Sequence, residues 1–147
     1  KNTCLNILKI DDLKKIDSFL SKHHVMSLAT TYLKDISSCN LFYAFDKDMV
    51  SFVVASSEDT THIQNILQNN KVAGSVVLET KTVGKIQGVQ FKGEFLPLDE
   101  KSLENLYFKK FPYALSMSPK LWQIKINYFK MTDNRLGFGK KIIWTDS

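Results

Sequence analysis

The chain has 147 residues, of which 44% are hydrophobic and 24% charged, a balance typical of a globular domain. This length predicts one domain, residues 1–147, with a hydrophobic core that needs neither metals nor disulfides. No apolar run approaches the roughly 18 residues of a membrane span, so no membrane partner is expected. Two cysteines are too few for a disulfide framework, and we therefore expect a cytoplasmic protein with reduced thiols.

The net charge of +5 comes almost entirely from lysine, because Arg135 is the only arginine among the 20 basic residues. Arginine makes the two-point contacts to phosphate and guanine that sequence-specific nucleic-acid binders favour. The lysines are scattered along the chain rather than clustered. The pattern therefore predicts a solvated lysine-rich surface, and a nucleic-acid partner is not expected.

The first predicted element is an amphipathic helix over residues 11–24, "DDLKKIDSFLSKHH". Its apolar residues recur at helical spacing and would face the core: Leu13, Ile16, Phe19 and Leu20. Asp11 or Asp12 would cap its start. His23 and His24 would close the helix, where a cation meets the negative end of the helix dipole. Adjacent histidines cannot both reach one metal from a single turn, so no metal site is expected there.

Extended segments follow this helix. Their β-branched and aromatic residues predict strands over residues 25–31, 40–45 and 49–55. A helix of about ten residues begins near Thr60, and strand character resumes over residues 71–79.

The remaining predicted elements are a long strand, a third helix and two closing strands: residues 83–98, 99–111, 121–131 and 137–144. Gly88 and Gly93 mark bends or a bulge in the long strand, and Pro112 ends the third helix. The chain thus has about seven strands and three helices, and most strands are joined by hairpins. This order predicts a mainly β fold, a small antiparallel barrel with helices at its openings.

The side-chain pattern separates the expected core from an expected interface. The four methionines are interpreted as core filler: Met26, Met49, Met117 and Met131. Phe91 and Phe95 share one face of the long strand and are expected to pack inward rather than to stack on nucleic-acid bases. The end of the chain carries more apolar surface than a small barrel easily hides, which predicts a dimer: Phe138, Ile142, Ile143 and Trp144.

Residues 56–62, "SSEDTTH", connect a predicted strand to a predicted helix and are called the crook below. A helix start offers unpaired backbone N–H groups and the positive end of the dipole, and this segment adds hydroxyl and imidazole donors. Such a cluster suits a phosphate. The alternative is that Thr60 or Thr61 simply caps the helix. Glu58 and Asp59 disfavour an anion unless they point outward.

Four stretches carry a resemblance to a known family: "NLFYAFD" (40–46), "SSEDTTHIQNILQNNKVAGSV" (56–76), "IQGVQFKGEF" (86–95) and "TDNRLGFGKKIIW" (132–144). Over nearly its whole length the chain resembles the flavin-binding split barrels related to pyridoxamine-phosphate oxidase. Within them it is most similar to the small YhbP-like proteins. The resemblance implies an FMN-binding split barrel that forms a homodimer, with one FMN per subunit in clefts between the two chains.

The resemblance also implies a set of cofactor-binding residues: Asn40, Ser56, Ser57, Thr61, His62, Gln87, Gly88 and Lys140. Asn40 begins the second strand, and Ser56 and Ser57 form the strand exit that meets FMN. Thr61 and His62 take the position of the phosphate-binding pair. Gln87 and Gly88 would contact the flavin, while Lys140 would come from the second subunit.

Two departures from the broader family narrow the expected function. Thr61 and His62 stand where that family has Arg-Lys, so two permanent charges are missing. The Arg-x-His that the oxidase uses for its vitamin substrate has no match, because "RLG" stands at residues 135–137. We expect an FMN-dependent oxidoreductase of unknown substrate rather than a pyridoxamine-phosphate oxidase, and no catalytic residue is assigned. The alternative is a non-catalytic split-barrel dimer that binds a small ligand, haem or another cofactor.

Overall fold

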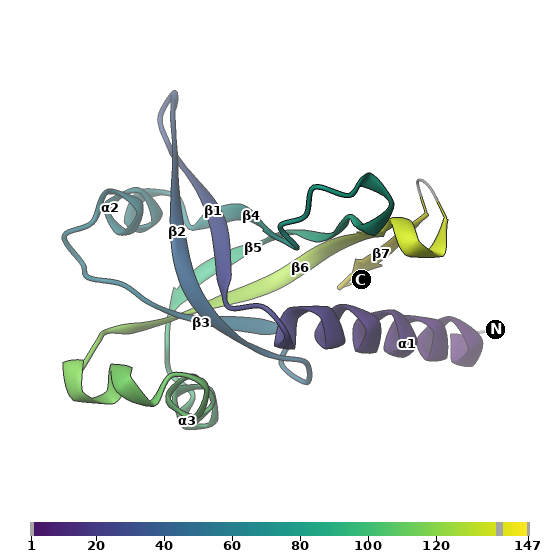
Figure 1. The fold of residues 1–147 in the computed structure, drawn as a ribbon. Coiled ribbons are helices and arrows are strands. Elements are labelled where there is room, and N and C mark those ends of the chain that lie inside the picture. The colour runs from purple at the N-terminus through teal and green to yellow at the C-terminus, as the bar shows by residue number, and fades with distance from the viewer. Residues whose placement is uncertain (1, 138–139, 147) are drawn as a thin grey trace.

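The computed structural model describes residues 2–137 and 140–146, and its elements follow the predicted order (Figure 1). The helices are α1 (Asn2–Ser21), α2 (Thr61–Gln68) and α3 (Lys101–Lys110), and the strands are β1 (Val25–Tyr32), β2 (Asp35–Asp46), β3 (Ser51–Ala55), β4 (Lys71–Val77), β5 (Gln87–Pro97), β6 (Leu121–Asp133) and β7 (Lys141–Thr145). Three short 3₁₀ helices connect them: η1 (Val83–Lys85), η2 (Pro112–Met117) and η3 (Asn134–Leu136). None of the helices in the described ranges is long and apolar enough to cross a membrane.

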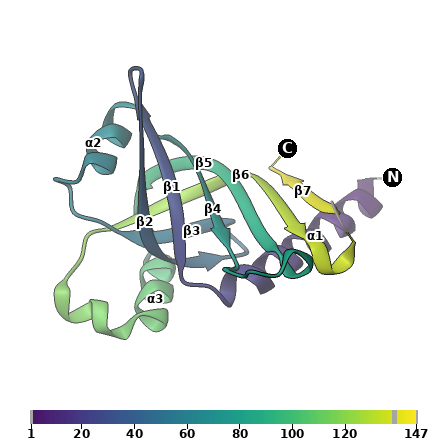
Figure 2. The same ribbon diagram turned by 45° about the horizontal axis from the view of Figure 1, so that its top comes forward.

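The seven strands form one antiparallel sheet in the order β3-β2-β1-β4-β5-β6-β7, and β3 also pairs with β6. This additional pairing closes six strands into a barrel. Strand β6 belongs to both parts of the sheet. Its residues 121–125 pair with β3, whereas its residues 128–132 pair with β7, which lies beyond the closed part (Figure 2). The predicted small barrel with helices is confirmed.

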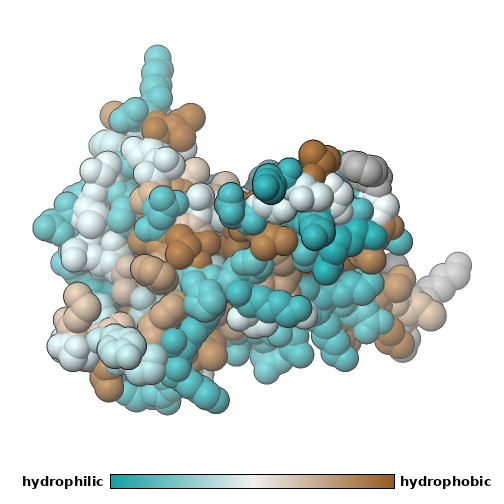
Figure 3. All heavy atoms as spheres, viewed as in Figure 1, coloured by the Kyte–Doolittle hydropathy of each residue, from teal (hydrophilic) through white to brown (hydrophobic). Residues whose placement is uncertain are grey.

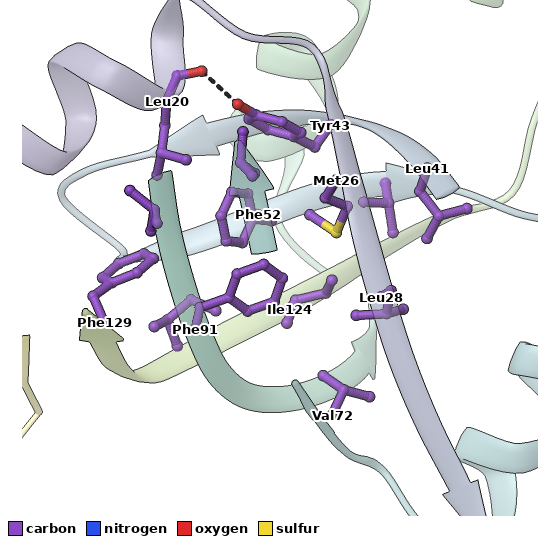
Figure 4. Packing of buried hydrophobic residues seen from close by; sticks show 14 of the residues in the cluster. Leu20, Met26, Leu28, Leu41, Tyr43, Phe52, Val72, Phe91, Ile124 and Phe129 are labelled. Atoms are coloured by element: carbon purple, nitrogen blue, oxygen red, sulfur yellow. Dashed lines mark hydrogen bonds between the residues drawn. The ribbon is translucent and has the colours of Figure 1, made fainter. Parts of the chain in front are cut away.

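The core fills the barrel with aromatic and aliphatic side chains from every wall (Figure 4). Phe52 lies at its centre and packs against Tyr43, Phe91 and Phe129, with ring centroids 4.8–6.1 Å apart. Phe91 and Phe95 are both buried, as predicted. Trp144 is also buried and packs on Phe129, so the part of the dimer argument that treated it as surface is wrong. Phe138 lies outside the described residues.

Helix α1 begins nine residues earlier than predicted, at Asn2 instead of Asp11. Asp11 and Asp12 therefore lie in its middle, and their predicted capping role is wrong. The first half of α1 runs beside β7, where the Lys9 ammonium donates a hydrogen bond to the Thr145 carbonyl at 3.3 Å (Figures 1 and 2). At the other end, the Tyr43 hydroxyl donates to the Leu20 carbonyl at 2.7 Å, which ties α1 to the barrel.

The predicted bulge is confirmed at Gly93, where the register between β5 and β6 shifts. A Cβ atom on Gly93 would lie 2.4 Å from the Lys125 carbonyl oxygen, so the bulge requires glycine. A Cβ atom on Gly74 would meet the Phe91 ring at 2.4 Å and the Ser27 carbonyl at 2.5 Å. This glycine lets β1 and β4 approach each other over the core. The long strand itself begins at Gln87, because residues 83–85 turn into η1.

Candidate functional site

The crook is anchored to the start of β6 by two hydrogen bonds. Strand β3 ends at Ala55, and the Ser56 N–H then donates to the Lys120 carbonyl at 3.0 Å. The Trp122 indole Nε1–H donates to the Ser56 carbonyl, also at 3.0 Å. Because both backbone groups of Ser56 are held, the strand exit has a fixed orientation relative to the helix that follows.

Three side chains of the crook form a compact polar cluster. The Ser56 hydroxyl and His62 Nε2 share a hydrogen bond of 2.5 Å, and the Thr60 hydroxyl lies 3.3 Å from the same nitrogen. The hydroxyls of Ser56 and Thr60 are 3.4 Å apart. Partial burial lowers the pKa of His62 from its ordinary value of 6.5. The imidazole is therefore neutral near pH 7, and the crook does not carry the histidine cation that a phosphate would favour.

Thr60 caps helix α2, as one of the two alternatives predicted. Its hydroxyl accepts a hydrogen bond from the Ile63 N–H at 3.4 Å and donates to the Ser57 carbonyl at 2.9 Å. Thr61 is the exposed first residue of the helix. In the part of the chain that the structure describes, the backbone N–H groups of Thr61 and His62 have no hydrogen-bond partner, as expected for a first helical turn. Two donors are thus free to meet an anion.

The charged residues around the crook are already paired or point into solvent. The Lys120 ammonium forms an ion pair with the Glu58 carboxylate and lies 4.7 Å from the centre of the Trp122 ring. Asp59 is exposed. Both carboxylates thus lie at the surface, and the lysine that contacts the crook, Lys120, is already paired. The crook offers neutral hydrogen-bond donors and the helix dipole.

An apolar groove of about 460 Å³, called the aromatic groove below, lies beside the crook between β2, β3 and η2. Its lining includes Asn40, Phe42, Phe111, Tyr113 and Met117. Ala55 and Pro119 also line it. Ala55 precedes Ser56, and Pro119 precedes Lys120, the residue whose carbonyl accepts the Ser56 N–H. The aromatic groove thus extends to the residue before the crook, although residues 56–62 do not line it.

The sequence pattern did not predict that η2 lines a groove. Met117 is 79% exposed and lines the groove, so its assignment to the core is wrong, and Tyr113 is 91% exposed. Both belong to a short apolar segment bracketed by Pro112 and Pro119. A prediction that assigns apolar residues to the interior cannot recognise such a segment, although its two prolines were a signal that it is not part of a regular helix.

The structure brings together only some of the predicted binding residues. Ser56, Ser57, Thr61 and His62 belong to the crook, and Asn40 borders the aromatic groove, where its side chain accepts a hydrogen bond from the Ser27 hydroxyl at 3.0 Å.

Gln87, Gly88 and Lys140 lie at the opposite end of the barrel. Trp122 of β6 is bonded to the crook, whereas Thr132 of β6 pairs with Gly88. At a rise of about 3.3 Å per residue, these two positions are about 30 Å apart along the strand. No small ligand reaches both groups within one chain.

The fold is a split barrel. At 13% identity and a TM-score of 0.74, the chain resembles a heme-binding protein from Mycobacterium smegmatis, with 91% of this chain covering 57% of that one. A NimC/NimA family protein from Clostridium acetobutylicum matches with a TM-score of 0.68 and 17% identity over 94% of both chains. A FAD-binding protein from Mesorhizobium loti matches with a TM-score of 0.60 and 16% identity over 73% of this chain and 83% of that one. Split barrels of this shape include proteins that bind heme or a flavin.

The chain belongs to the UPF0306 family, which includes YhbP. It is 42% identical over 138 residues to a UPF0306 protein of Klebsiella pneumoniae, a match that spans 92% of this chain and 94% of the relative. It is 38% identical over 141 residues to the UPF0306 protein YhbP of Escherichia fergusonii, spanning 94% and 96% of the two chains. No protein-family model matches the chain.

Proposed function

We propose that this protein binds FMN between two copies of the chain and uses it in an oxidoreductase reaction. The observation that carries the proposal is the junction of the crook with the aromatic groove. A flavin mononucleotide has an apolar planar ring and a phosphate. The apolar groove extends to Ala55, the residue before the crook, and the crook carries the free N–H groups of Thr61 and His62. A volume of about 460 Å³ falls in the range of small-molecule sites, roughly 300–1,000 Å³.

The residues of the crook fit a phosphate through hydrogen bonds rather than charge. The free N–H groups of Thr61 and His62 and the exposed hydroxyls of Ser57 and Thr61 would hold it. The apolar lining of the groove would take the ring system. The bound flavin supplies hydride or electron transfer, while the protein positions it and excludes water.

The proposal requires a second copy of the chain. Gln87, Gly88 and Lys140 lie too far from the crook to contact the same ligand in one subunit. A partner subunit would bring its own Gln87 end against the crook and close the aromatic groove. The apolar surface available for this contact includes Phe42, which is 58% exposed, and Tyr113, which is 91% exposed.

Titration with FMN and with riboflavin tests the phosphate half of this site, because riboflavin has the same ring and no phosphate. Thr61→Arg adds a permanent charge at the helix start, where it should tighten FMN binding by about 1–2 kcal/mol and leave riboflavin unchanged. Ser102→Arg is the matched control, because Ser102 is an exposed residue in the first turn of α3. An equal response to both ligands, or a gain from Ser102→Arg, would mean that the crook is only a helix cap.

The absorption spectrum of the purified protein, together with light scattering, tests cofactor and assembly. Flavin absorbance bands and a dimeric mass at micromolar concentration are the expected results. A Soret band would instead assign the protein to the haem-binding alternative. A monomer that still binds FMN would remove the two-chain cleft from the proposal.

A further inference from the structure

A second groove lies between α1 and the end of the sheet where β5, β6 and β7 meet η3. It is called the arginine groove below. Its volume is about 510 Å³, and apolar side chains from three elements form its floor: Phe19, Met131 and Ile142. Its rim carries three cationic side chains: Lys15 of α1, Lys22 just after α1, and Arg135 of η3. Apolar walls with a few convergent polar groups are typical of a small-molecule site.

The one carboxylate in this groove serves to hold the arginine. The Asp133 side chain is only 6% exposed, and its two oxygens accept hydrogen bonds from Arg135 Nε at 3.1 Å and Nη2 at 2.9 Å. These bonds lower the pKa of Asp133, which therefore stays ionised. The Arg135 side chain is 58% exposed, and in the described part of the chain its Nη1 group has no partner. A buried carboxylate thus orients a partly exposed guanidinium that lines the groove.

A structural role accounts for the Nε and Nη2 groups of Arg135 but, among the residues described, leaves its Nη1 group unused. Asp133 also caps η3 by accepting the Arg135 backbone N–H at 3.0 Å, a bond that any residue except proline could donate at position 135. Arg135 also compensates the charge of the buried Asp133 carboxylate, which would be destabilising if it were left unpaired. All other basic residues of the chain are lysines, so the single arginine stands where a fixed two-point donor is held in place.

We propose that the arginine groove binds a small organic anion, with the carboxylate or phosphate of the ligand on Arg135 and its apolar body on the floor. Lys15 and Lys22 add attraction from the α1 side. No residue of the crook lines this groove, but Gln87, which the proposed dimer brings toward the flavin, does line it, so the two sites are adjacent across the proposed interface.

The fluorescent probe 1-anilinonaphthalene-8-sulfonate tests the proposal, because it joins an apolar body to an anion. N-phenyl-1-naphthylamine is its uncharged counterpart. Arg135→Lys keeps the charge and loses the two-point contact, so we expect binding of the sulfonate probe to weaken by about tenfold and binding of the neutral probe to stay unchanged. Lys15→Gln should weaken only the sulfonate probe, by about threefold. Lys14→Gln is its matched control, since Lys14 is an exposed neighbour on α1 that does not line the groove.

Competition identifies the head group and the place of binding. Displacement of the probe by octanoate indicates a carboxylate ligand, and displacement by phenyl phosphate indicates a phosphate ligand. Equal displacement by octanol would overturn the proposal, because no anion would then be recognised. So would wild-type sulfonate affinity in both Arg135→Lys and Lys15→Gln. Loss of probe binding in Phe42→Ser but not in Lys15→Gln would place the probe in the aromatic groove and would equally overturn it.

Discussion

Replacing Tyr43 by phenylalanine isolates the hydrogen bond that ties α1 to the barrel. The Tyr43 side chain is fully buried, its hydroxyl donates to the Leu20 carbonyl at 2.7 Å, and burial raises the pKa of the phenol so that it remains a donor (Figure 4). The phenylalanine ring would keep the edge contact with Phe52, at 5.1 Å, and the ammonium of Lys110 above it, at 4.4 Å. Only the hydrogen bond is removed.

The size of the stability loss depends on whether the Leu20 carbonyl keeps another hydrogen bond. The Leu20 carbonyl also accepts the His23 N–H at 3.2 Å, so it is not left without a partner. The loss should therefore be that of one net hydrogen bond, about 1 kcal/mol, rather than the 1–3 kcal/mol of an orphaned buried group. This corresponds to a drop in Tm of about 2–4 °C for a chain of this size.

Urea unfolding followed by circular dichroism measures the effect of Tyr43→Phe, with Tyr113→Phe as the control because Tyr113 is 91% exposed. The control should match the wild type. A Tyr43→Phe loss near 3 kcal/mol would mean that the second bond to Leu20 does not protect its carbonyl. No loss at all would mean that the hydroxyl bond does not hold α1 to the barrel.

Two further stability measurements test the crook and the bulge. Burial lowers the pKa of His62, so below its ordinary pKa of 6.5 the unfolded chain binds more protons than the folded one, and stability falls as pH falls through this range. His62→Gln should make this decline smaller in urea titrations at pH 7.5 and 5.5, whereas an unchanged decline would contradict the burial of the imidazole. Gly93→Ala should cost about 1–3 kcal/mol, because its Cβ would lie 2.4 Å from the Lys125 carbonyl oxygen. Gly84→Ala, with nothing within 4 Å of its Cβ, is the control, and equal effects of the two would refute the steric argument.

The order of helices and strands could be predicted because most of them bury one face. The burial of β5 alternates over Val89, Phe91, Gly93 and Phe95, which is the period-2 pattern visible in the sequence. The first half of α1 was missed for the opposite reason. Its apolar residues Ile7, Leu8 and Ile10 are 53–59% exposed, so no core-facing stripe marks the helix there.

The crook could be located from the sequence, but its electrostatic state could not. Hydroxyl residues between a strand and a helix indicated the free N–H groups. The neutral state of His62 depends on burial, and the pairing of Lys120 with Glu58 joins residues far apart in the chain. The orientation of Arg135 was equally hidden, because it depends on the burial of Asp133 beneath it. Each of these properties depends on burial or on contacts that a sequence pattern does not show.

The two proposed anion sites attract their ligands differently, and ionic strength separates them. At the crook the donors are neutral and the nearest ammonium, that of Lys120, is paired with Glu58. The rim of the arginine groove carries the ammonium groups of Lys15 and Lys22 and the guanidinium of Arg135, whose charge is partly offset by Asp133. Screening shortens from about 10 Å at 0.1 M salt to about 3 Å at 1 M, which weakens interactions between exposed charges and spares short hydrogen bonds. Added salt should therefore weaken binding of the sulfonate probe several-fold and change FMN binding to the wild type little, whereas FMN binding to Thr61→Arg should become salt-sensitive. If FMN binding to the wild type falls with salt as steeply as binding of the sulfonate probe, full positive charges hold the phosphate, and its assignment to the free N–H groups of Thr61 and His62 is wrong.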